Sequence, residues 1–116
     1  MPYLNYNLTK IRAFIGDDDF VMEKMIDIFL ENTPIMISKI EEGLENKDYD
    51  QVNFYAHKLK SSIDNLSINQ LTDEIRLIEK YAKERSSLGN LPDLINKLKA
   101  VIKIVIEEIK IDFKKA

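Results

Sequence analysis

The sequence predicts an all-α fold: an up-and-down four-helix bundle with an additional short helix at its N-terminal end. Apolar residues recur at helical spacing along almost the whole chain, and alternating strand-like patterns are absent. Only three glycines and three prolines occur in 116 residues, each at a place where a helix can end or bend. Because long amphipathic helices joined by short loops pack as antiparallel neighbours, these observations together favour a bundle.

The first two predicted helices meet at Gly16. Residues 8–15 have the apolar spacing of a short helix, with Asn7 as a candidate N-cap and Gly16 as the residue that ends it. Residues 17–19 are all aspartates, which place a cap and negative charge where a second helix begins. Residues 20–30 are apolar on more than one side, so we expect this stretch to be covered on two faces.

The middle of the chain contains one ambiguous point, at Thr33 and Pro34. This pair fits either a cap with proline at the first position of a new helix or a kink within one long helix. The apolar stripe then continues to about Asn46. Asp48 begins the next predicted helix, which extends to about Leu66.

Two further helices are predicted in the last third of the chain. Residues 67–70, Ser-Ile-Asn-Gln, have the form of a capping box and are expected to start a helix that ends near Arg85. Residues 86–90 form the clearest loop. A last helix is predicted from about Pro92, with apolar residues in helical register as far as Ile109. We expect residues 1–116 to form a single domain.

Composition excludes several classes of site and partner. The chain has no cysteine, which excludes a disulfide scaffold, a thiolate zinc site and a cysteine nucleophile. Its formal net charge of −3 argues against nucleic acid as the main partner. Residues 1–6 lack the basic start and apolar run of a signal peptide, and no apolar stretch approaches the roughly 20 residues that span a membrane. We therefore expect a cytoplasmic protein without a membrane or nucleic-acid partner.

The single histidine, His57, is predicted to point to solvent. At roughly 100° per residue, it lies about 160° from Leu59, the centre of the apolar stripe of its helix. Phe54, about 140° from that centre, is also expected to be exposed, either as part of a docking surface or as an isolated apolar residue without a role. Lys60 stands one turn after the histidine, where it fits either a phosphoryl-binding cation or a solvated lysine. The stripe itself comprises Val52, Tyr55, Ala56, Leu59, Ser62, Ile63 and Leu66.

Residues 56–66, Ala-His-Lys-Leu-Lys-Ser-Ser-Ile-Asp-Asn-Leu, resemble the signature of histidine-containing phosphotransfer domains. That signature has an alanine, the phospho-accepting histidine, any residue, a leucine, a lysine, a glycine and small residues that lead to a leucine. Residues 16–20, 28–34 and 77–79 are similar to other characteristic stretches of the family, in the family's order. The resemblance covers roughly residues 8 to 110 and implies an all-helical bundle.

The resemblance implies a role for each residue around the histidine. His57 would accept the phosphoryl group, Lys60 would be the cation beside it, and Glu79 would accept a hydrogen bond from the other imidazole nitrogen. Glu79 fits an ordinary carboxylate at the edge of the core equally well. We expect Phe54, Lys58 and Ser61 to contact a partner. Ser61 stands where the family usually has glycine, so the rate of transfer or the choice of partner is in question.

The implied function is that of a phosphorelay protein that exchanges a phosphoryl group between His57 and the aspartate of receiver domains. It would be a phosphocarrier rather than an enzyme, with no cofactor or metal of its own; the receiver would supply Mg²⁺ and most of the catalysis. The expected partners are a response-regulator receiver domain and, as a second candidate, a hybrid sensor histidine kinase, with the chain itself a monomer. The alternative is a helical adaptor that binds a receiver or kinase without carrying phosphate. An enzyme that uses His57 as a general base is disfavoured, because the histidine is predicted on a convex face rather than in a pocket.

Overall fold

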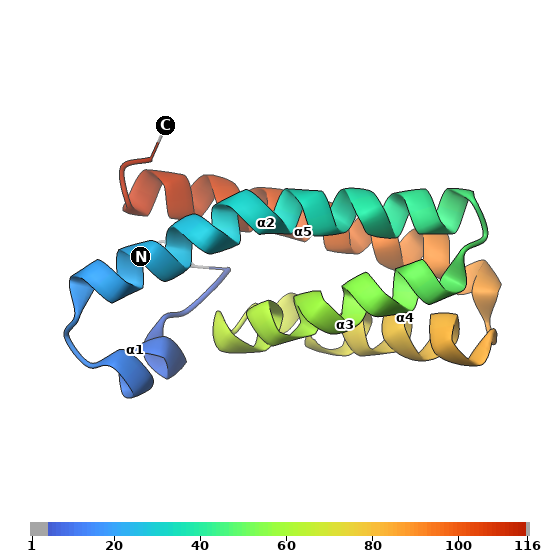
Figure 1. The fold of residues 1–116 in the computed structure, drawn as a ribbon, viewed down its shortest axis with the longest axis horizontal. Coiled ribbons are helices and arrows are strands. Elements are labelled where there is room, and N and C mark those ends of the chain that lie inside the picture. Colours follow the sequence, from blue (N-terminus) through green and yellow to red (C-terminus); the bar gives the residue numbers. More distant parts are fainter. Residues whose placement is uncertain (1–4, 116) are drawn as a thin grey trace.

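The computed structural model describes residues 5–115, which form five α-helices and, within that range, no strand. The helices are α1 (Thr9–Ile15), α2 (Asp19–Glu45), α3 (Tyr49–Asn65), α4 (Thr72–Glu84) and α5 (Leu91–Asp112). Helices α2 to α5 run up and down along one axis, and α1 packs across one end of the bundle (Figure 1). The predicted bundle with an extra N-terminal helix is therefore confirmed. Residues 1–4, part of the stretch compared with a signal peptide, lie outside the described residues.

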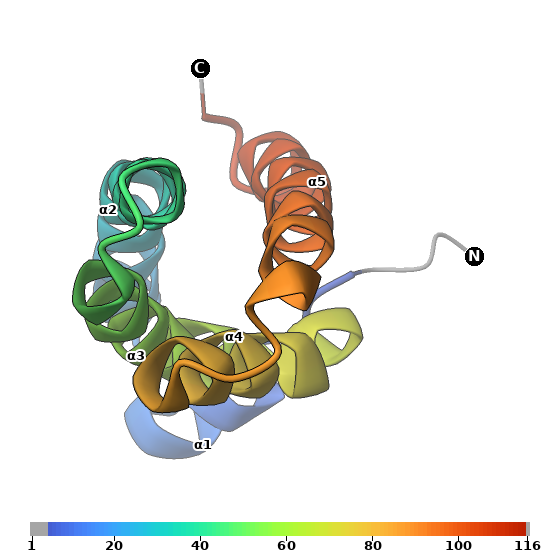
Figure 2. The same cartoon turned by 90° about the vertical axis from the view of Figure 1, so that its right-hand side faces the viewer.

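The core lies between the four long helices, with α3 placed between α2 and α4 (Figure 2). The predicted stripe of α3 faces this core: Leu59 is fully buried, while Tyr55 and Ser62 are half-buried at the edges of the stripe. Burial of each such leucine or isoleucine stabilises the fold by about 1.5–3 kcal/mol. The register of α3 is thus set by its apolar side. The buried members of the stripe are Val52, Ala56, Leu59, Ile63 and Leu66.

Local signals set the ends of the first three helices close to the predicted positions, although the N-cap of α1 is Leu8 and not Asn7. The side chain of Asn7 accepts a hydrogen bond of 2.7 Å from the N–H two residues later, at the start of α1. Gly16 ends that helix at φ 63°, in the left-handed region that glycine adopts without strain. Asp18 and Asp48 cap α2 and α3, each accepting a 3.1 Å hydrogen bond from the N–H three residues later.

Helix α2 is one continuous helix of 27 residues with Pro34 inside it. Thr33 and Pro34 therefore lie within one long helix and do not start a new one. Its coverage differs from the prediction. Met22, Ile26 and Phe29 face the core, but Phe20 is 71% exposed and Ile28 is 57% exposed. The expectation that residues 20–30 are covered on two faces is therefore wrong, because Phe20 and Ile28 are left exposed to solvent.

Helix α4 begins later than predicted. Ser67 adopts φ 50°, and its N–H donates to the carbonyl of Asp64, so this serine ends α3 instead of capping α4. Ile68 is fully buried, a 3₁₀ turn covers Asn69–Leu71, and α4 starts only at Thr72. The capping-box prediction is wrong: Ile68 precedes the 3₁₀ turn and Leu71 precedes α4, and neither start has a side-chain cap. Residues 86–90, the predicted loop, contain a second 3₁₀ turn at Leu88–Asn90.

No helix in the described part of the chain has the length and apolar character needed to cross a membrane.

Candidate functional site

His57 projects from the middle of α3 away from the core. Its side chain is 66% exposed, as its position opposite the apolar stripe predicts. The neighbours that follow in sequence confirm the register, since Lys58 is exposed and Leu59 is fully buried. An imidazole in this position is open to a macromolecular partner.

Glu79 of α4 joins the histidine to a lysine. One oxygen of its carboxylate, Oε2, is hydrogen-bonded to Nδ1 of His57. The other, Oε1, accepts a hydrogen bond of 2.8 Å from Nζ of Lys60. The side chain of Glu79 is 18% exposed and that of Lys60 is 27% exposed, so both are partly shielded from water. The structure thus brings together the three residues that the sequence singled out for phosphoryl chemistry.

The electrostatics of Glu79 keep it ionised. Burial of the carboxylate raises the pKa of Glu79, but hydrogen bonds from Lys60 and His57, and the charges of these partners, lower it more. The net pKa of Glu79 is below the usual value of a glutamate. At neutral pH the group facing His57 is therefore a carboxylate, which can only accept hydrogen bonds.

This contact decides which ring nitrogen is free. Because Glu79 only accepts, the neutral imidazole of His57 carries its proton on Nδ1, and Nε2 keeps a lone pair. A hydrogen-bonded carboxylate also orients the ring. The arrangement supplies a nucleophilic nitrogen on an exposed face, together with an anion that stabilises positive charge on the ring.

A mixed apolar and basic surface adjoins the histidine. Phe54, one turn before His57, is 53% exposed, and its ring lies 5.0 Å from that of Tyr55, edge to face. The ammonium of Lys58 stands 4.7 Å from the centroid of the Phe54 ring, a cation–π geometry. Ser61 is exposed as well. The three residues expected to contact a partner therefore lie on the outer surface of α3, alongside His57.

Helix α2 extends this surface with residues that sequence reasoning did not assign to a site. Met25, Ile28 and Ile35 are exposed apolar residues at spacings of three and seven, and Asn32 lies between them. A crevice of about 220 Å³ is lined by Met25, Ile28 and Asn32 of this row and by Ser62 of α3. We call this surface the α2–α3 face; it comprises Met25, Ile28, Asn32, Ile35, Phe54, Lys58 and Ser61. The available signal was the second apolar side of residues 20–30, a pattern that predicts coverage within the fold.

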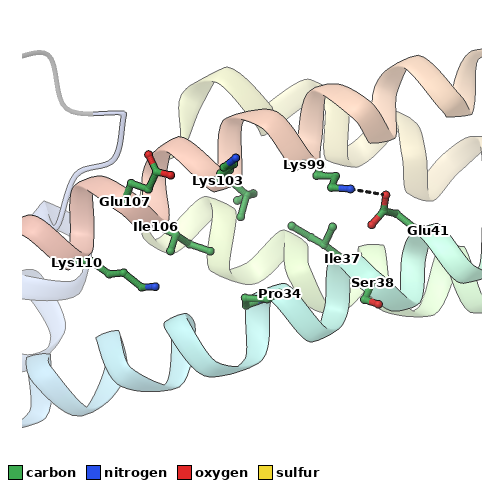
Figure 3. A pocket seen from close by; sticks show the side chains of 10 residues that line it. Pro34, Ile37, Ser38, Glu41, Lys99, Lys103, Ile106, Glu107 and Lys110 are labelled. Carbon is green, nitrogen blue, oxygen red and sulfur yellow. Dashed lines mark hydrogen bonds and ion pairs between the residues drawn. The ribbon is translucent and has the colours of Figure 1, made fainter. Parts of the chain in front are cut away.

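A larger groove lies on the α5 side of α2 (Figure 3). Its volume is about 350 Å³, its floor includes Ile37 and Ile106, and the ion pair between Lys99 and Glu41 spans it at 3.1 Å. Neither this groove nor the α2–α3 crevice includes His57 in its lining. Among residues 5–115, no group of three or more histidine, aspartate or glutamate side chains is placed to hold a metal ion.

Comparison with known families agrees with this geometry. A family model described as the Hpt domain, the histidine-containing phosphotransfer domain, matches residues 24–110, which are 87 of the 116 residues. Searches of curated proteins and of solved structures found no match. The matched range includes His57 and Glu79 and extends from the first turns of α2 almost to the end of α5. The chain therefore belongs to the histidine-containing phosphotransfer domains, non-enzymatic phosphocarriers of phosphorelays that have no cofactor of their own and exchange phosphate with receiver domains.

Proposed function

We propose that His57 is the residue that carries the phosphoryl group, and that it does so on Nε2. The observation that supports this most directly is the hydrogen bond between Nδ1 and Glu79, since it leaves Nε2 as the nucleophile on an exposed face. His57 is also the only histidine of the chain and lies inside the range that matches the family.

The transfer step follows from this geometry. The Nε2 lone pair attacks the phosphorus of an aspartyl phosphate on the receiver, a P–N bond forms, and the bond from phosphorus to the aspartate oxygen breaks. The aspartate leaves with the electron pair as a carboxylate. The imidazole ring becomes positively charged while its proton stays on Nδ1, where Glu79 stabilises it. The reverse step returns the phosphoryl group to a receiver.

Lys60 has two tasks in this proposal. Its 2.8 Å hydrogen bond holds the Glu79 carboxylate in place, and its positive charge offsets part of the negative charge that a phosphoryl group brings to this surface. Because Lys60 follows His57 by three residues, it lies on the neighbouring turn of the same helix.

The α2–α3 face is the proposed docking surface for the receiver. Exposed apolar side chains beside a reactive group are typical of a protein interface, and an aromatic anchor such as Phe54 often dominates the binding energy. Ser61 offers a small side chain next to the histidine. A hybrid sensor histidine kinase is a second candidate partner, and the cytoplasmic location and monomeric state stay predictions of the sequence.

The two candidate functions, a phosphocarrier and an adaptor that binds a receiver without carrying phosphate, differ in whether this chain becomes phosphorylated. We expect acid-labile, base-stable phosphate on the wild-type protein after incubation with phosphorylated receivers, and none on His57→Gln. Because the side chain is 66% exposed and the amide of glutamine can still donate to Glu79, this substitution should leave the fold intact, with a stability change of about 1 kcal/mol or less. Undiminished labelling of His57→Gln would refute the assignment. Receiver binding without any labelling of the wild-type protein would favour the adaptor.

A further inference from the structure

Helix α3 contacts α4 through a side-chain hydrogen bond one turn before His57. Nδ2 of Asn53 donates to the backbone carbonyl of Glu79, at 3.0 Å, in a partly buried position. Asn53 is half-buried and precedes the histidine by four residues, so the two lie on adjacent turns of the helix. The residue that Asn53 holds is thus the one whose carboxylate contacts the ring of His57.

Glu79 is held from α3 at three of its atoms. Asn53 binds its backbone oxygen, Lys60 binds Oε1 at 2.8 Å, and His57 contacts Oε2. Asn53 and Lys60 stand four residues before and three residues after the histidine. A glutamate side chain has several rotatable bonds, so its carboxylate reaches a chosen ring atom reliably only when its backbone is also fixed. Asn53 fixes the backbone of Glu79 through the hydrogen bond to its carbonyl oxygen.

The other polar contacts between α3 and α4 do not reach the backbone of Glu79. Arg76 binds both carboxylate oxygens of Asp64, and Arg85, at the end of α4, binds Asp50; both pairs lie at the exposed surface and involve long arginine side chains. Leu59 and Ile63 of α3 and Ile75 and Ile78 of α4 are fully buried, but apolar packing has no preferred direction and tolerates small sliding movements. A hydrogen bond is directional. The carbonyl of Glu79 also lies inside α4, where the N–H four residues later binds it, so losing the Asn53 contact leaves α4 itself intact.

We propose that Asn53 is a positioning residue for the phosphoryl-accepting histidine. By fixing the backbone of Glu79, it keeps the carboxylate on Nδ1 of His57 and the lone pair on Nε2. Asn53 touches neither the reacting nitrogen nor the phosphoryl group. Its effect on the rate of transfer rests on the function proposed above, whereas its effect on the ring of His57 is measurable in the isolated protein.

The test compares Asn53→Leu with the wild-type protein by ¹⁵N NMR of the His57 ring at a pH where the imidazole is neutral. In the wild-type protein the two ring nitrogens should have well-separated shifts, one protonated and one not. In Asn53→Leu the shifts should move toward each other as the two tautomers mix. Transfer from a phosphorylated receiver should slow about fivefold, the factor that one net intramolecular hydrogen bond represents.

Gln51 offers a matched control on the same helix. Its side-chain amide donates a 2.8 Å hydrogen bond to the carbonyl of Lys39, so Gln51→Leu removes a contact of the same type, but to α2 instead of α4. We expect Gln51→Leu to leave the ring shifts of His57 unchanged. Asn53→Ala, which also lacks the donor but adds no bulk, should reproduce the effect of Asn53→Leu.

Three results would overturn the proposal: unchanged shifts in both Asn53 variants, an equal change in Gln51→Leu, or mixed tautomers already present in the wild-type protein. Failure of the proposed function gives a different result. In that case the NMR shifts respond to Asn53 as expected, but no receiver transfers phosphate to the wild-type protein.

Discussion

Replacing Glu79 with glutamine removes the charge that faces His57 while keeping nearly the same shape. The amide oxygen can still accept from Nδ1 of His57, but as a neutral acceptor, and the amide nitrogen can instead turn toward the ring or toward Lys60. We expect Glu79→Gln to accept phosphate more slowly than the wild-type protein, because the ring loses the anion that stabilises its positive charge during transfer.

The size of the effect follows from the two acceptors. A hydrogen bond to a charged partner contributes about 1.5–3 kcal/mol and a neutral one about 0.5–1.5 kcal/mol. The difference is about 1–1.5 kcal/mol, which corresponds to a rate lower by about fivefold to tenfold. Because the Glu79 side chain is only 18% exposed, water should replace little of the lost interaction.

The same substitution should change how stability depends on pH. The pKa of Glu79 is lowered in the folded protein, so the unfolded chain binds a proton more readily than the folded one. This carboxylate therefore stabilises the fold above its unfolded pKa, and the contribution is lost as pH falls through the lowered folded pKa. Glu79→Gln has no such contribution to lose, so its stability should differ from that of the wild-type protein at neutral pH and approach it in acid.

Two measurements check this prediction. Single-turnover transfer from a phosphorylated receiver gives the rate, and denaturant unfolding at neutral and acid pH gives the two stabilities. A transfer rate equal to that of the wild-type protein would show that the carboxylate plays no part in the step. A stability difference that stays constant on acidification would contradict the ionisation of Glu79 described above.

Three further substitutions probe the surface around the histidine. Phe54→Ala should weaken receiver binding about tenfold in a titration, with little change in melting temperature. The control, Phe20→Ala, removes another exposed ring of the same bundle and should bind normally. Equal losses of affinity in both variants would refute a specific contact at Phe54. Lys60→Ala should slow transfer more than it weakens receiver binding. The transfer rate and the receiver affinity are measured separately, and a normal rate in the bound complex would contradict this prediction. Ser61→Gly should speed transfer from a panel of receivers by clearing the approach to His57, whereas slower transfer would show that the hydroxyl contacts the phosphoryl group or the partner.

Local patterns in the sequence were sufficient for most of the fold. The helical period of the apolar residues predicts the register of α3, and with it the exposure of His57, because burial of that stripe dominates the energy of the helix. The caps at Asp18 and Asp48 are equally local, since each needs only an N–H three residues away.

The errors occur where two elements compete or where coverage is decided elsewhere in the chain. Ser67 begins a capping-box pattern, but its backbone is in the left-handed region and follows the end of α3. A short sequence pattern does not show whether such a serine ends one helix or starts the next. The second apolar side of α2, which includes Ile28, has the composition of a covered face. Only the arrangement of the other helices shows that the chain leaves it exposed.

Part of the site depends on contacts between helices, which no local pattern contains. His57 and Lys60 share a helix, so their proximity follows from spacing alone. The approach of Glu79, which lies 22 residues after the histidine, was expected only from the family resemblance. The role proposed for Asn53 was not predicted, because its partner is a backbone carbonyl and every residue has one.

The position of the phosphate on the labelled protein tests the central claim most directly. The wild-type protein is incubated with a phosphorylated receiver, digested under basic conditions that preserve a P–N bond, and mapped by mass spectrometry; ³¹P-coupled NMR of the intact protein identifies the ring nitrogen. We predict a single phosphate, on Nε2 of His57, which returns to fresh unphosphorylated receiver. Phosphate on another residue, or a phosphorylated His57 that no receiver can discharge, would contradict the assignment of this histidine as the carrier.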